Sequence, residues 1–407
     1  MEVLYARCAG LDVHKETVVA CARVAEGGKV DQAVETFPTT TSGLLALADW
    51  LETHGVRQVA MEATGVYWKP VWHILEGAFE LTLANAMHVK NVPGRKTDVN
   101  DAMWLADLLA HGLIRASFVP PLEVQELRAL TRSRKQFVRE RSGHVQRIEK
   151  VLEDANLKLS VVLSDLLGQS GRAVLQALID GETRPEHLLK RVNRRVKASR
   201  ASLLEALNGR VTKHHRFMLR LHLAQIDALD QAIAAIETEV GDTLAPFREA
   251  AERLTTIPGI SHVAAHVLVA ECGIDMTRFP DAANLISWAG FCPKNDESAG
   301  KRRSTRVRKG SPWLKTTLVQ AAWAAVRVKG SYLQAQFVRL RARRGPKKAI
   351  LAVAASMLTA AYYMLRDGTC YHDLGAAHFA PADPAKTAHR LVRKLSQLGF
   401  QVELKAA

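Results

Sequence analysis

Short apolar runs alternate with runs of helical spacing over the first 120 residues of this chain. The predicted elements are, in order, strands at 4–11, 17–24 and 33–37, a helix at 42–53, a strand at 56–61, a helix at 67–76, a strand at 81–84 and a helix that opens near residue 98. Ser42 is the expected N-cap of the first helix, because it directly precedes the apolar positions of helical spacing. The pattern therefore predicts an α/β domain over residues 1–121.

Strand signals disappear between residues 122 and 248, where helical spacing dominates. Apolar side chains recur every three or four residues from Leu127 to Leu152 and again from Leu219 to Val240. Such spacing over several turns predicts two long helices of coiled-coil type, packed either as an antiparallel hairpin or between subunits.

A basic segment lies between the two predicted long helices. Residues 184–220 hold eleven Lys and Arg residues against Glu186 and Glu205. A solvated helix face is the plain alternative, but so one-sided a balance favours contact with nucleic acid. The candidate contact residues are Arg191, Arg194 and Arg195.

A third, mainly helical region starts near Arg253. Residues 256–261 read Thr-Ile-Pro-Gly-Ile-Ser and precede a predicted helix at 262–273. This turn resembles a helix-hairpin-helix motif, which offers backbone N–H groups to phosphates, although Ser261 stands where that motif has its second glycine. An ordinary turn between two helices is the open alternative.

Beyond residue 328 the chain becomes basic and then apolar. Six Arg and Lys residues fall between 339 and 348 with no acid nearby, and the apolar helix predicted at 350–365 needs a packing partner. The last 35 or so residues look like a loosely organised extension. These boundaries predict domains at residues 1–121, 122–248, 249–340 and 341–407.

Composition narrows the class of protein. The 407 residues are 48% hydrophobic and 24% charged, as in soluble globular proteins. The net charge of +15 favours a polyanionic partner, with nucleic acid ahead of a membrane surface. We find no signal-peptide pattern and no apolar run near the roughly 20 residues of a membrane span. The five cysteines are scattered without a C-x-x-C pair, which predicts a reduced, cytoplasmic protein without a zinc site.

Four carboxylates fall where a metal site could form. Asp12 ends the first predicted strand, Glu62 follows the fourth, and Asp98 and Asp101 open the next helix. Residues i and i+3 of a helix share a face, so the last two can reach one site together. Grouped carboxylates repel one another unless cations intervene, and paired Mg²⁺ ions are the usual solution in phosphodiester chemistry. Any one of these acids alone is better explained as a surface acid, whereas the joint pattern favours the metal site.

A loop bounded by glycine and proline carries a serine beside many cations. Residues 296–301 read Asp-Glu-Ser-Ala-Gly-Lys and have no strand or helix periodicity. Ser298 is a candidate nucleophile for a phosphodiester, because nearby cations would stabilise the developing charge. Those cations are Lys301, Arg302, Arg303, Arg306, Arg308 and Lys309. Serine is also common in turns, and on the residues alone that plainer explanation has the edge.

Taken together, these motifs resemble the DEDD transposases of insertion sequences, which join a domain like that of RuvC Holliday-junction resolvases to a C-terminal transposase domain with a serine. The order of elements in the first domain is also that of the ribonuclease-H-like (RuvC-like) fold. The matching motifs run in family order over residues 1 to about 325: Gly10-Leu11-Asp12-Val13-His14-Lys15, Met61-Glu62-Ala63-Thr64-Gly65-Val66-Tyr67, Lys96-Thr97-Asp98-Val99-Asn100-Asp101-Ala102, Ile257-Pro258-Gly259-Ile260, and the stretch from Trp288 to Lys301.

The resemblance implies a role for each candidate site residue. Asp12, Glu62, Asp98 and Asp101 would hold Mg²⁺, and Ser298 would attack DNA to form a covalent phosphoserine. A noncoding guide RNA would pair with both donor and target DNA. The family loop usually reads Ser-Ser-Gly-Gly, whereas residues 297–300 read Glu-Ser-Ala-Gly, so a single serine carries the role and Ser304 is a weaker substitute.

The sequence therefore predicts a bacterial or archaeal insertion-sequence transposase that cuts and rejoins DNA by transesterification. Two duplexes require several active sites, so a homodimer or homotetramer is expected. Two other functions stay open. A hydrolytic Holliday-junction-type endonuclease would use metal-activated water and leave no DNA attached to Ser298. A non-catalytic nucleic-acid-binding protein would have no need of the four carboxylates.

Overall fold

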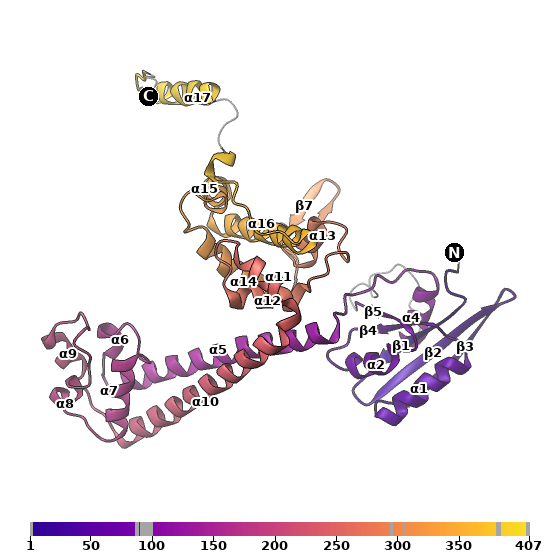
Figure 1. The fold of residues 1–407 in the computed structure, drawn as a ribbon, viewed down its shortest axis with the longest axis horizontal. Coiled ribbons are helices and arrows are strands. Elements are labelled where there is room, and N and C mark those ends of the chain that lie inside the picture. The colour runs from indigo at the N-terminus through magenta and orange to yellow at the C-terminus, as the bar shows by residue number, and fades with distance from the viewer. Residues whose placement is uncertain are drawn as a thin grey trace. The chain divides into compact units, whose positions relative to one another are not determined.

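The computed structural model describes residues 3–85, 89, 101–293, 296–304, 306–379 and 384–403. The chain divides into two compact units, Met1–Pro120 and Pro121–Ala407. The first unit holds a five-stranded sheet with helices, and the second is mainly helical (Figure 1). The predicted combination of an α/β region with a helical remainder is confirmed, whereas the finer division of residues 122–407 into three domains stays a prediction.

The sheet of the first unit has the strand order β3-β2-β1-β4-β5. β2 pairs antiparallel with both β1 and β3. β4 pairs parallel with β1, and β5 pairs parallel with β4. The predicted succession of strands and helices is present, and its assignment to the ribonuclease-H-like fold stays a proposal. The elements are β1 (Arg7–Val13), β2 (Thr17–Glu26), β3 (Lys29–Pro38), α1 (Thr41–Thr53), β4 (Gln58–Glu62), α2 (Trp68–Leu75), β5 (Glu80–Ala84) and α4 (Asp101–Ala110).

Alternating side chains give the sheet two different faces. Leu11 and Met61 lie in a hydrophobic core with Leu47 of α1 and Leu75 of α2. On the opposite face, α4 packs against β1 and β4. Asp12, next to the last residue of β1, and Glu62, the last residue of β4, therefore each point to one of these two faces.

The N-cap of α1 is Thr40, whose side chain accepts a hydrogen bond from the Gly43 backbone nitrogen. The prediction of Ser42 as the cap was wrong by two residues, because Ser42 already belongs to the first turn of the helix. Both residue types can cap a helix, so composition alone does not distinguish them.

Two long helices of the second unit, α5 (Leu122–Asp154) and α10 (Lys213–Thr243), pack side by side (Figure 1). Three contacts show that the helices run antiparallel, since the residue number increases along α5 while it decreases along α10. These contacts are Arg134 with Glu237, Arg141 with Asp230, and His144 with His222. The predicted helix hairpin is present, and its description as a coiled coil stays a prediction. Between the two helices the chain forms α6 (Leu159–Val162), α7 (Gln169–Ile179), α8 (Pro185–Leu189) and α9 (Arg200–Ala206). The first three share a core with both long helices, and Leu207, the C-cap of α9, joins it.

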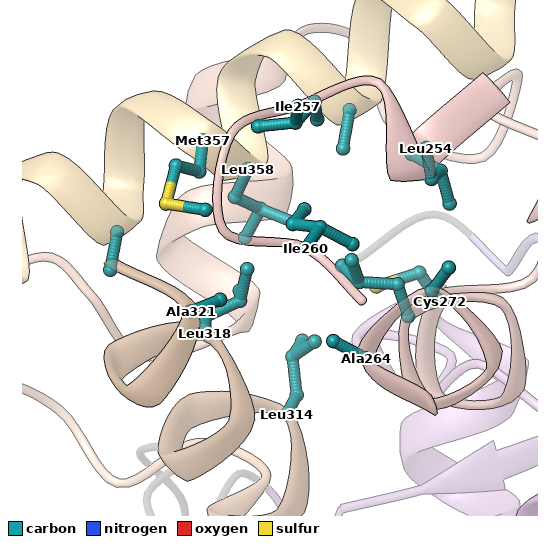
Figure 2. Packing of buried hydrophobic residues seen from close by; sticks show 14 of the residues in the cluster. Leu254, Ile257, Ile260, Ala264, Cys272, Leu314, Leu318, Ala321, Met357 and Leu358 are labelled. Carbon is teal, nitrogen blue, oxygen red and sulfur yellow. The ribbon is translucent and has the colours of Figure 1, made fainter. Parts of the chain in front are cut away.

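Most of the remaining helices of the second unit build one further hydrophobic core, to which no described side chain of α17, at the end of the chain, contributes. Figure 2 shows Ile257 and Ile260, from the turn that follows α11, packing near Leu358 of a later helix, and all three belong to this core. The elements are η1 (Ala245–Phe247), α11 (Arg248–Thr255), α12 (His262–Cys272), α13 (Ala282–Trp288), β6 (Asp296–Ser298), β7 (Lys301–Ser304), α14 (Pro312–Ala325), α15 (Tyr332–Arg344), α16 (Pro346–Asp367), η2 (Ala376–Phe379) and α17 (Pro384–Gln397).

The turn between α11 and α12 packs tightly against α14. Gly259 has a φ of +85°, and a Cβ there would lie 2.3 Å from the Ala321 carbonyl oxygen, so only glycine fits. Ser261 caps α12 by accepting a hydrogen bond from the Ala264 backbone nitrogen. The helix–turn–helix is therefore present, and helix capping explains the serine, while a contact with phosphate stays a prediction.

Helix α16 is long and apolar enough to cross a membrane by length and composition, so the expectation that no such run exists was wrong. One or two such helices are weak evidence of a span, since the core helix of a soluble protein passes the same test. Ala354, Met357 and Ala361 are at most 1% exposed in the core shared with α12 and α14. These contacts supply the packing partner that the sequence pattern required.

Candidate active site and nucleic-acid interface

Asp12 and Glu62 lie on neighbouring parallel strands. The register of β1 and β4 sets Leu11 opposite Met61, so the residues that follow come next to each other at the carboxyl ends of both strands. The Asp12 side chain is 20% exposed, and its Oδ2 lies 3.2 Å from Nε2 of His14. The fold thus brings two of the predicted acids to one edge of the sheet.

Both acids share the face of the sheet that α4 covers. Side chains alternate along a strand, and Cys8 and Ala60, which have the same parity as Asp12 and Glu62, pack against Leu109 of α4. Asp101 is the first residue of α4. Asp12 and Glu62 therefore share this face of the sheet, and Asp101 begins the helix that covers it, with its side chain exposed.

Helix α4 approaches β1 as closely as backbone atoms allow. A Cβ on Gly10 would lie 2.2 Å from the Ala102 carbonyl oxygen and 2.5 Å from the Ala106 nitrogen. Nearer its other end, the helix is tied to β2 by Arg23, whose Nε donates to Asp107 at 2.8 Å. The placement of Asp101 follows from these contacts, and the sequence pattern did not indicate either of them.

The fourth predicted acid, Asp98, lies outside the described residues. Among the residues that are described, no group of three His, Cys, Asp or Glu side chains could hold a metal ion. The donor chemistry does fit Mg²⁺, a hard cation that takes oxygen ligands, because Asp12 and Glu62 offer neighbouring carboxylates and Asp101 begins the helix beside them. The predicted metal site stays a prediction.

Ser298 ends a strand of a β-hairpin, so the prediction of an irregular loop was wrong. β6 and β7 pair antiparallel, with Ser298 opposite Lys301. Between them, Ala299 and Gly300 have φ angles of 50° and 72°, the pattern of a type I′ turn. An alanine in this left-handed region costs about 1–2 kcal/mol. The glycine at the second turn position was the sequence signal for this hairpin.

The base of this hairpin is fastened to α14. Lys315 Nζ donates to the carbonyl oxygen of Gly290 at 2.6 Å and to that of Arg308 at 3.0 Å, so it joins the two ends of the hairpin. A Cβ on Gly290 would lie 2.8 Å from the Gly310 nitrogen. Burial also lowers the pKa of Lys315. Because these contacts hold both chain segments that lead into the hairpin, Ser298 is presented from a fixed base. No sequence motif predicted this arrangement.

Exposed cations follow the serine along the hairpin. Arg302 lies in β7, and its side chain is outside the described part of the structure. The exposed side chains are those of Lys301, Arg303, Arg306, Arg308 and Lys309. Within the described residues none of these five forms an ion pair with an acid, and Arg308 donates to Ser287 Oγ at 3.3 Å. This unneutralised charge suits contact with phosphates.

Arg191, Arg194 and Arg195 lie in the connection between α8 and α9. All three side chains are exposed. Because they lie on a loop, a solvated helix face does not explain them. Their contact with nucleic acid stays a prediction.

Two family models match this chain. A model of the DEDD transposases of IS110, described as "Transposase", matches residues 9–157. A model described as "Transposase IS116/IS110/IS902 family" matches residues 251–338. The first match includes the four predicted acids, and the second includes Ser298.

Similar proteins come from bacterial insertion elements. A transposase for insertion sequence element IS1111A from Coxiella burnetii is 24% identical over 277 residues, 67% of each chain. An uncharacterized 42 kDa protein of insertion element IS900 from Mycobacterium paratuberculosis is 25% identical over 386 residues, 88% of each chain. An uncharacterized 43.6 kDa protein of insertion element IS110 from Streptomyces coelicolor is 29% identical over 150 residues, 36% of each chain. This chain therefore carries the two transposase domains of the IS110 family of insertion sequences.

Proposed function

We propose that this transposase cuts and rejoins DNA with the acids of its first unit and the serine hairpin of its second. The observation that supports this most directly is that Asp12 and Glu62 lie side by side on neighbouring parallel strands, under the helix that Asp101 begins. We take this unit to be a ribonuclease-H-like domain.

In this proposal Asp12, Glu62, Asp98 and Asp101 hold Mg²⁺. When bound, the metal supplies positive charge that stabilises the phosphate as negative charge builds on it. His14, whose Nε2 lies 3.2 Å from Asp12 Oδ2, would orient that carboxylate.

Ser298 would be the nucleophile. Its hydroxyl loses a proton, Oγ bonds to phosphorus, and one phosphorus–oxygen bond of the DNA backbone breaks as the leaving oxygen takes up a proton. Attack of a DNA hydroxyl on the phosphoserine reverses these changes, so rejoining needs no ATP. The exposed cations of the hairpin stabilise the negative charge that develops on the phosphate.

The buried cysteines of the first unit are not alternative nucleophiles. Burial raises the pKa of Cys8 to about 11 and that of Cys21 to about 12, so these thiols stay protonated and unreactive.

The partners in this proposal are donor DNA, target DNA and an element-encoded guide RNA. The net charge of +15 and the exposed arginines between α8 and α9 support polyanionic partners. The protein would act in the bacterial or archaeal cytoplasm as a homodimer or homotetramer, with the acids of one subunit meeting the serine hairpin of another.

The test combines end-labelled DNA with two variants. Asp12→Asn should abolish cleavage with the fold retained, and its matched control is Asp31→Asn, which removes an exposed acid of β3. Ser298→Ala should keep nucleic-acid binding and lose the covalent protein–DNA adduct, and Ser304→Ala should retain it. Cleavage by wild type without any adduct would instead support the hydrolytic endonuclease. An adduct in Ser298→Ala would show that the nucleophile lies elsewhere.

A further inference from the structure

The second unit contains a cavity of about 830 Å³ that the proposed chemistry does not use. Residues of α5, α10, α12 and α14 line it. Its volume falls within the range of roughly 300–1,000 Å³ that is typical of small-molecule sites. A single phosphate ion would leave most of this space empty, so the occupant should carry a larger group.

The cavity wall carries an excess of positive charge. Arg134, Lys135 and Arg139 of α5 line it, and Glu237 is the one acid among the lining residues. Glu237 is already engaged, because Arg134 Nε donates to it at 2.9 Å. Lys135 has neutral partners, the Trp313 carbonyl and the hydroxyls of Thr316 and Thr317. In the described part of the chain, no acid forms an ion pair with Lys135 or Arg139.

Burial lowers the pKa of Lys135, the neighbouring Arg139 lowers it further, and Glu271, which is paired with Arg132, partly opposes both effects. Two cations held this close, without a direct ion pair to an acid in the described residues, favour an anionic ligand. Histidine adds little charge here, because burial lowers the pKa of His266, which also lines the cavity.

An aromatic ring lies beside these cations. The Trp313 ring centroid is 5.5 Å from Arg139 Cζ, 5.7 Å from Lys135 Nζ and 5.9 Å from Arg132 Cζ. Deeper lining is apolar, with Val240 and Ala321 among the buried residues. Trp313 does not itself line the cavity, but its ring packs on Lys135 and Arg139, which do. Cations and an apolar wall together match the phosphate and the flat base of a nucleotide.

We propose that this cavity accepts one unpaired nucleotide of a nucleic-acid strand. The base would enter the apolar part near Ala321 and Ala324, and its phosphate would contact Lys135 and Arg139. A base within a duplex is stacked and paired, so it would have to leave the helix before it could enter a site of this size. The inference rests on the proposed function, because it gives that nucleic-acid partner a specific contact with α5, α12 and α14.

The test measures binding of fluorescent 12-nucleotide DNA and RNA strands, and of a duplex of the same length, to the full chain. Ala324→Trp fills the cavity from an exposed position without changing any charge. It should weaken single-strand binding about tenfold, the scale of one lost base contact, and leave duplex binding unchanged. Arg139→Ser should also weaken single-strand binding. Its matched control, Arg147→Ser, removes an exposed arginine from the same helix outside the cavity and should weaken it less.

Photo-crosslinking of wild type with a 5-iodouracil strand provides a readout that needs no variant. Adducts should map to peptides of α5, α10, α12 or α14, which line the cavity. Crosslinks confined to other helices would overturn the inference, and so would full single-strand affinity in a folded Ala324→Trp. Either result could occur with adduct formation by Ser298 intact, so it would not count against the proposed function. If the wild-type protein bound no nucleic acid at all, both the inference about the cavity and the proposed function would fail.

Discussion

Replacing Gly10 with alanine should disable the acidic site without touching any acid. The added Cβ would lie 2.2 Å from the Ala102 carbonyl oxygen, whereas an ordinary contact begins at 3.4 Å. Both partners are backbone, so α4 must move away from β1 by about 1 Å. Overpacking of this kind costs about 1–3 kcal/mol of the free energy of unfolding.

The displacement matters because Asp101 directly precedes Ala102 in α4. A shift of about 1 Å in a catalytic group can lower a rate about 100-fold. We therefore expect Gly10→Ala to lower DNA cleavage about 100-fold while single-strand binding by the second unit stays unchanged.

Urea unfolding and cleavage of end-labelled DNA provide the two readouts. Gly77→Ala is the matched control in the same unit, because a Cβ there meets nothing within 4 Å and should change stability by less than about 0.5 kcal/mol. Wild-type stability together with wild-type cleavage in Gly10→Ala would refute the reasoning. Lost stability with normal cleavage would show that the spacing of α4 does not position a catalytic acid.

Three further predictions concern charge. Binding of RNA and DNA should fall at least about tenfold between roughly 50 and 200 mM salt, and near-constant affinity would contradict a phosphate-dominated interface. Glu271→Ala should lower the free energy of unfolding by about 3 kcal/mol, measured in urea, because the 1%-exposed Glu271 accepts hydrogen bonds from Arg132 Nε and Nη2 and from Ser311 Oγ. Glu271→Gln should cost less, since it can still accept the hydroxyl. Burial, and then the charge of His144, lowers the pKa of His222 below its usual 6.5. Below pH 6.5 the unfolded chain therefore takes up the proton more readily than the folded one, so the contribution of His222 to the free energy of unfolding should be greatest above pH 6.5 and should decline below it. His222→Gln should flatten this decline in urea unfolding.

Much of the first unit could be predicted from the sequence. Each predicted strand of the sheet is present, with its ends shifted by up to four residues, because strand alternation is a local signal. The convergence of Asp12 and Glu62 followed from their places at strand ends. The role of Gly10 could not be predicted, since a glycine in a strand does not show which helix backbone will approach it.

Long-range contacts of the second unit were beyond local patterns. Lys315 was one more cation in a basic stretch, and only the fold shows that it joins the two ends of the serine hairpin. The cavity combines Lys135, His266 and Thr316, which are far apart in the chain. A periodicity of 3.6 residues predicts helices but does not show which side chains of different helices meet.

The first turn of α14 connects three features of the second unit. Ser311, its N-cap, donates to the buried Glu271, Trp313 lies beside the cations of the cavity, and Lys315 holds the base of the serine hairpin. Helical side chains within one turn move together, so a ligand that shifts Trp313 should also shift Lys315. We therefore expect a bound nucleotide to alter how the hairpin presents Ser298, and a folded Ala324→Trp to slow adduct formation even when DNA is saturating. Unchanged adduct formation at saturating DNA would mean that the cavity and the hairpin act independently.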